Sequence, residues 1–68
     1  MFTKYKYIVV NKNDSIIGGG HDTFTSEYDA ITAAKRFVQF RHLNNCIIKV
    51  YANSGTDWVT VKVINDIE

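Results

Sequence analysis

Apolar and polar residues alternate most regularly near the end of the chain, where residues 58–63 read Trp-Val-Thr-Val-Lys-Val. A period of two is typical of a β-strand with one buried face. Residues 4–10 and residues 46–51 are rich in aromatic and β-branched side chains, which also favour strands. Residues 15–17 predict a shorter strand, which lies between the polar residues 11–14 and the glycine run 18–20.

Residues that favour turns separate these predicted strands. Residues 11–14 read Asn-Lys-Asn-Asp and favour a turn, because Asn and Asp tolerate left-handed backbone. Residues 53–57 contain a glycine and predict a hairpin loop. The run Gly18-Gly19-Gly20 is expected to interrupt the second strand as a bulge, a bend or a mobile break. Residues 23–25 either continue that strand or form a short strand of their own.

A helix is predicted between the second and third strands, over residues 27–43. Ser26 is a good N-cap, and Asp29 three residues later can answer it as in a capping box. At about 100° per residue, one face of this helix is apolar and should be buried. That face consists of Ala30, Ile31, Ala34, Phe37 and Val38.

The end of the predicted helix carries Arg41 and His42 in its last turn, where cations are favoured, with Asn44-Asn45 as the stop signal. The elements follow the order β-β-α-β-β. The sequence therefore predicts an α+β fold, an antiparallel sheet of four to five strands with one amphipathic helix on one face. Residues 1–68 suffice for a single domain, and a chain of this size should be marginally stable.

Alternation also predicts which strand residues lie under the helix. These are Tyr5, Tyr7, Val9, Ile48, Val50, Val59, Val61 and Val63, although either face of the first strand suits a core. The opposite face of the sheet should carry Lys4, Lys6, Lys49, Tyr51, Trp58 and Lys62. Lysines interleaved with aromatic rings suit a nucleic-acid backbone with stacked bases, or an acidic partner. Lysines also simply solubilise an uncovered sheet face while their stems cover aromatic carbon.

The outer side of the helix carries a second candidate surface. Phe40 lies about 180° from Ile31, away from the expected core. Arg36 is one turn before it, and Lys35 and Gln39 flank the same side. Because Arg and aromatic side chains dominate interface hot spots, this group is a candidate partner-binding site. The alternative is that Phe40 packs against the following loop near Leu43.

Composition narrows the class of protein. The net charge is only +1, so bulk electrostatics do not indicate nucleic-acid binding. A single cysteine, Cys46, allows no internal disulfide. We expect no membrane span and no signal peptide, because no long apolar run occurs, and a reducing cytoplasm suits a lone cysteine.

Motifs for catalysis or cofactor binding are not predicted. Gly18-Gly19-Gly20-His21 lacks the Lys-Ser/Thr of a phosphate-binding loop. His21, Asp22, His42 and Cys46 match no metal-ligand spacing. Cys46 opens a predicted strand and is expected to be a small core residue rather than a nucleophile paired with His42. We therefore expect no enzyme, no metal and no cofactor.

A set of residues resembles small phage-encoded inhibitors, the type I-F anti-CRISPR group. The resemblance lies in a first-strand Tyr5, in Ala34-Lys35-Arg36 and Gln39-Phe40 on the helix, and in Trp58 of the C-terminal hairpin. It implies a non-enzymatic protein that acts in the host cytoplasm. Such a protein blocks an RNA-guided surveillance complex by binding its backbone subunits where target DNA would pair. The implied contact residues are Tyr5, Lys35, Arg36, Gln39 and Phe40.

Two other functions remain open. One is a small nucleic-acid-binding module that uses the lysine and aromatic residues of the sheet. The other is an assembly protein that associates with itself through a strand edge. The partner is thus expected to be a host protein or ribonucleoprotein, or a nucleic acid, but not a membrane, and the chain a monomer or weak homodimer.

Overall fold

The structure is a computed structural model that describes residues 4–67, with side chains described through residue 65. Residues 1–3 and 68 of the predicted domain lie outside the described part. The described residues form β1 (Tyr5–Val10), β2 (Ile16–Gly19), α1 (Glu27–Phe40), β3 (Cys46–Asn53) and β4 (Trp58–Ile67). The α+β class and the β-β-α-β-β order are confirmed.

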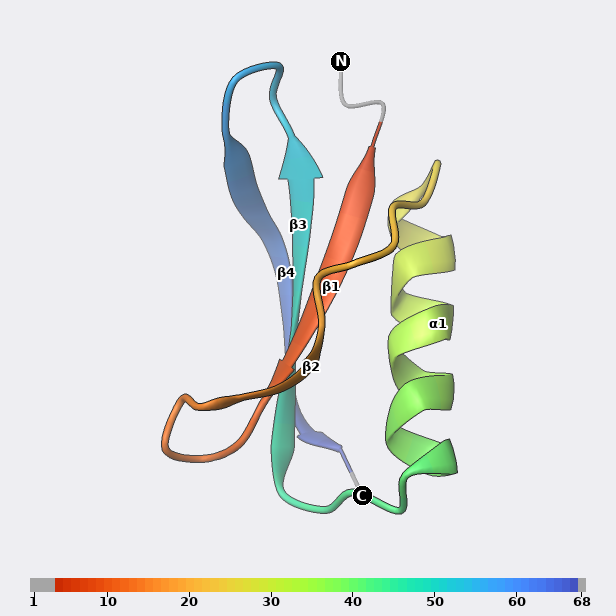
Figure 1. Cartoon of the computed structure of the whole chain (residues 1–68), viewed down its shortest axis with the longest axis vertical. Helices are drawn as coiled ribbons and strands as arrows, with labels where there is room; N and C mark the ends of the chain where they lie inside the picture. Colours follow the sequence, from red (N-terminus) through yellow and green to blue (C-terminus); the bar gives the residue numbers. More distant parts are fainter. Residues whose placement is uncertain (1–3, 68) are drawn as a thin grey trace.

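The strands form one antiparallel sheet in the order β2-β1-β3-β4. Helix α1 packs on β1 and β3, the two central strands, and lies along one face of the sheet (Figure 1). No fifth strand occurs within residues 4–67. The predicted short strand at residues 23–25 amounts to one bridge, in which Phe24 and Tyr5 exchange two backbone hydrogen bonds of 2.8 and 2.9 Å.

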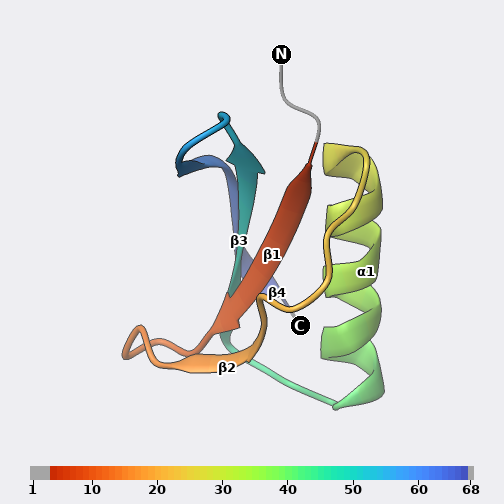
Figure 2. The same ribbon diagram turned by 45° about the horizontal axis from the view of Figure 1, so that its top comes forward.

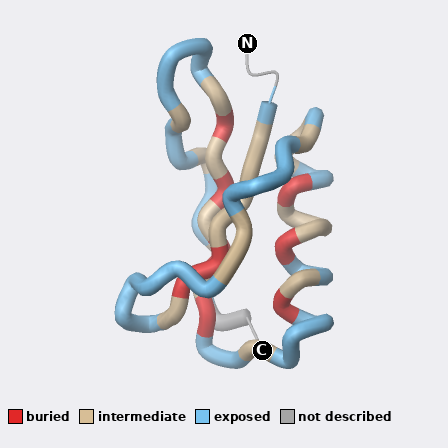
Figure 3. The backbone as a smooth tube through the Cα atoms, viewed as in Figure 1, coloured by how far each residue is buried: buried red, intermediate tan, exposed pale blue. Residues whose placement is uncertain are grey.

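The core lies between α1 and the central strands. Red segments mark it along the inner side of α1 and along β3 in Figure 3. Its buried cluster consists of Val9, Ala30, Ala34, Val38, Cys46, Ile48 and Val50. Two of the three buried helix residues are alanines, which allow the helix backbone to approach the sheet closely. The predicted inward positions of β1 and β3 and the core position of Cys46 are confirmed.

The start of α1 follows the prediction. Ser26 is the N-cap, and its Oγ accepts a hydrogen bond of 3.0 Å from the backbone N–H of Asp29. This bond satisfies one of the donors that a helix N-terminus leaves without an intrahelical partner.

The helix ends at Phe40, earlier than the predicted residue 43, and Arg41 and His42 lie beyond its last turn. His42 adopts a left-handed backbone with φ 54°. Its N–H and that of Leu43 donate to carbonyls of the last turn, the Leu43 bond to Val38 being 3.0 Å. This is a Schellman motif. The helix stops there because Leu43 turns back and packs against the core.

Strand β4 corrects two of the predicted face assignments. A register shift in β4 leaves Val61 as an extra residue, and beyond it Lys62 pairs with Val50 while Val63 pairs with Lys49. Directly opposed residues share a face of the sheet. Lys62 therefore lies on the helix side and Val63, 45% exposed, on the opposite face, the reverse of the prediction. Strict alternation fails here because a bulge inserts one residue.

The glycine run does not break β2, which includes Gly18 and Gly19. A Cβ at Gly18 would overlap Cζ of the Phe37 ring. A Cβ at Gly19, where φ is 92°, would lie 2.6 Å from the Tyr7 carbonyl oxygen. The run is therefore explained by the close approach of α1 and β1 to β2, and not by mobility.

We expect Gly18→Ala to lower the free energy of unfolding by about 1–3 kcal/mol, because it overpacks the contact with Phe37. In a Phe37→Leu background the same change should cost less, with a coupling of at least about 0.5 kcal/mol. Urea denaturation of the four chains measures this. Equal costs of the Gly18 change in both backgrounds would show that the Phe37 ring is not what excludes a side chain there.

Replacing His42 by glycine should raise the free energy of unfolding by about 0.5–1 kcal/mol, because glycine adopts a left-handed backbone without the Cβ penalty. Asn44→Gly is the matched control, since Asn44 has no positive φ. That change should lower stability or leave it unchanged. Stabilisation by both glycines to the same degree would contradict the capping role of His42.

Candidate functional site

The open sheet face, the face opposite α1, holds one aromatic cluster. The Lys6 ammonium lies 4.4 Å from the Trp58 ring centroid and 5.9 Å from that of Tyr51. The register explains this, because Lys6 pairs with Tyr51, and Trp58 lies in the adjacent cross-strand row. The cluster is a cation–π arrangement of the Lys6 ammonium with the two rings.

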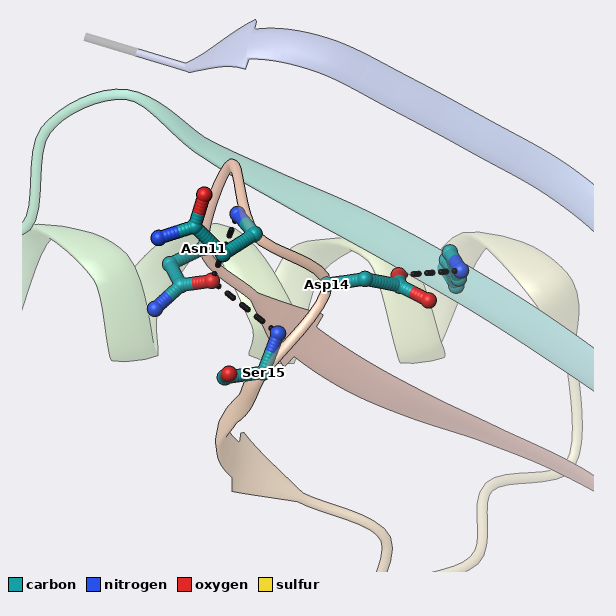
Figure 4. A network of polar contacts seen from close by, with 5 residues as sticks. Asn11, Asp14 and Ser15 are labelled. Carbon is teal, nitrogen blue, oxygen red and sulfur yellow. Dashed lines mark hydrogen bonds and ion pairs between the residues drawn. The ribbon is translucent and has the colours of Figure 1, made fainter.

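The loop between β1 and β2 reaches toward the open sheet face. In Figure 2 it projects away from α1. The loop is held by the Asn11 side chain, whose Oδ1 accepts N–H bonds of 2.8 and 3.0 Å from Asn13 and Ser15 (Figure 4). Asp14, with φ 64°, then places its carboxylate 2.9 Å from the Lys49 ammonium. The hydrogen bond and charge of Asp14 raise the pKa of Lys49.

These contacts reduce the positive charge available on the open sheet face. Lys49 is paired with Asp14, and Lys62 lies on the other side of the sheet. Lys4 remains in the same cross-strand row as Trp58, since the Asn53 N–H donates to its carbonyl at 2.9 Å. The face thus offers Lys4 and Lys6 where four lysines were expected. Nucleic-acid binding there stays a prediction with a weaker electrostatic basis.

A shallow, widely open depression of about 780 Å³ lies between α1 and Tyr7 of β1. We call it the α1 groove, and it is lined by Tyr7, Ala33, Arg36, Phe37, Gln39, Phe40 and His42. Its aromatic part continues inward, because the Phe37 ring lies 6.3 Å from Tyr7, and Tyr7 lies 6.1 Å from Phe24. Burial, and secondarily the charge of Asp22, raise the pKa of Tyr7.

The rim of the α1 groove is cationic and aromatic. Phe40 is 85% exposed, so the alternative that it packs near Leu43 is wrong; Leu43 packs against the core instead. The Arg41 guanidinium lies 5.1 Å from the Phe37 ring centroid and reinforces the basic side of the rim. None of the residues described as lining this groove carries a carboxylate.

The five residues expected to form one contact surface do not all gather. Arg36, Gln39 and Phe40 line the α1 groove together. Tyr5 is half-buried and packs against the core, and its backbone pairs with Phe24. Lys35 is exposed and is not among the groove residues. Helical spacing places it on the flank of α1 away from Ala33 and Phe37.

Sequence reasoning missed two members of the groove. Tyr7 and Phe37 were assigned to the core, and each is only partly buried. The signal that could have revealed the groove is the glycine run, because glycines without side chains let the Phe37 ring lie against β2. A second hollow of about 660 Å³ shares Ala33 and Arg36 and extends toward the N-terminus of α1, where Asp29 lines it.

Three other features bear on the kinds of site that residues 4–67 can form. Within residues 4–67, no group of three or more His, Cys, Asp or Glu side chains is placed to hold a metal ion. The thiol of Cys46 is buried. In the described part of the chain, no helix has the length and apolar character needed to cross a membrane.

We expect Asp14→Asn to lower the pKa of Lys49 toward its ordinary value of 10.5. Because the folded-state pKa of Lys49 is raised, the stabilisation from this ion pair is present below pH 10.5 wherever Asp14 is ionised, and it is lost as pH rises through the folded pKa of Lys49. Titration of the Lys49 side-chain signals by NMR in both chains tests this. An identical midpoint in the two chains would contradict the ion pair in solution.

Comparison with known proteins gives no match: neither a protein-family model, nor a curated protein, nor a solved structure is significantly similar to this chain.

Proposed function

We propose that this chain is a non-enzymatic inhibitor that binds a host macromolecular complex through the α1 groove and blocks it by occlusion. The observation that carries the proposal is the exposed Phe40 beside Arg36 at the rim of an aromatic groove. The resemblance to type I-F anti-CRISPR inhibitors supplies the target class, an RNA-guided surveillance complex in the host cytoplasm. No cofactor takes part.

The energetics favour a docking role for this surface. Burying a Phe side chain that water now surrounds contributes about 1.5–3 kcal/mol. Aromatic and Arg side chains near the centre of an interface are the usual hot spots. The groove is open to solvent beside α1, so a partner can reach it without opening the core.

The size of the chain suits occlusion. A standard interface covers about 800 Å² on each partner, which is about a sixth of this chain's accessible surface of 4751 Å². The described residues extend over 33 × 21 × 18 Å. A domain of this size bound at a DNA-pairing surface would exclude the DNA by volume alone.

The test measures target-DNA binding by a purified type I-F surveillance complex in the presence of the chain. The wild-type chain should reduce DNA binding. Arg36→Ala/Phe40→Ala should require at least about tenfold more protein for the same effect, corresponding to about 1.4 kcal/mol.

The matched control is Lys12→Ala/Tyr28→Ala, which also removes one cation and one exposed aromatic ring, at positions outside the groove. This control should inhibit like the wild type. If the wild-type chain leaves DNA binding unchanged, or if both double variants inhibit equally, the proposal fails. Circular dichroism establishes that each variant is folded.

A further inference from the structure

The α1 groove combines an apolar floor with one guanidinium at its rim. Tyr7, Ala33 and Phe37 supply the floor, and Arg36 and His42 lie at the rim. Arg41, stacked over Phe37, adds a second guanidinium at the same end of α1. The described lining includes no carboxylate, and the nearby charge of Asp22 acts on Tyr7, so an anionic partner group is favoured at the end of the groove that Arg36 and Arg41 make basic.

We infer that the occupant of the α1 groove is an acidic protein segment with an apolar anchor side chain, the anchor lying against Phe37 and Phe40 and its neighbouring carboxylates facing Arg36. The inference rests on the proposed function, because it names the partner chemistry of that same surface. It does not require the partner to be the surveillance complex.

The apolar anchor and the ion pairs contribute unequally to the binding affinity. The apolar anchor contributes most of the affinity, because burying an apolar side chain stabilises a complex more than an ion pair that stays exposed to solvent. The cations therefore select which segment binds, and Phe40 decides how tightly it binds.

A nucleic acid fits the groove less well. Affinity for a phosphate backbone accumulates over several neutralised phosphates, and the chain has a net charge of only +1. The adjoining hollow carries Asp29, which would repel a backbone that continued along α1. A protein segment can instead be acidic at one end only.

The experiment selects peptides from a random phage-displayed library on the immobilised full-length chain. The enriched peptides should carry Asp or Glu beside an aromatic or aliphatic residue. Phe40→Ala should weaken the binding of a selected peptide by at least about tenfold, and Lys12→Ala/Tyr28→Ala should not. Selection repeated on Arg36→Glu should lose the acidic bias.

Several results would overturn the inference: no enriched peptides, peptides without acidic bias, or peptides whose binding ignores Phe40→Ala. Binding of a labelled single-stranded DNA at low salt that Arg36→Glu abolishes would also overturn it, in favour of a phosphate ligand. The two proposals fail separately. Acidic peptides without inhibition of the surveillance complex would refute only the inhibitor, and inhibition without acidic peptides would refute only the partner chemistry.

Discussion

The contact of the Phe37 ring with Gly18 links the edge strand β2 to α1 and to the candidate site. The ring fills the space that a β2 side chain would occupy and also lies against Tyr7 of β1. It thereby joins α1 to the edge strand and forms the floor of the α1 groove. A chain without a disulfide has few other means of fixing an edge strand, so this apolar contact matters for stability as well as for the site.

A single helix covers only part of a four-stranded sheet. The remaining sheet surface is either exposed to solvent or covered by side chains and a loop. α1 packs on β1 and β3, so β4 is left more exposed and Val59 remains 38% accessible on the helix side. On the open sheet face, lysine stems and the β1–β2 loop provide cover. Lys6 stacks on Trp58, and Asp14 pairs with Lys49. Much of the charge on that face therefore has a structural use.

Phe40, at 85% exposure, buries little surface in the fold of a small, marginally stable domain. Natural proteins accept such side chains where function uses them, at a cost in solubility. The described groove residues include Arg36 and no acidic side chain, so the lining is basic as well as apolar. Both properties favour a partner-binding surface over a pocket between helix and sheet, where the closely packed alanines of α1 leave little room.

Local sequence determined the element order, the cap at Ser26 and the inward faces of β1 and β3, because turn chemistry, capping and short periodicity act over a few residues. It did not determine the end of α1, which depends on Leu43 reaching the core. Nor did it predict that a bulge at Val61 exchanges the faces of Lys62 and Val63, since strict alternation hides an inserted residue. The gathering of Arg36, Gln39 and Phe40 with Tyr7 into one groove, apart from Tyr5 and Lys35, was decided only by the tertiary structure. That gathering depends on how closely α1 approaches β2, a distance set by packing between segments far apart in the chain.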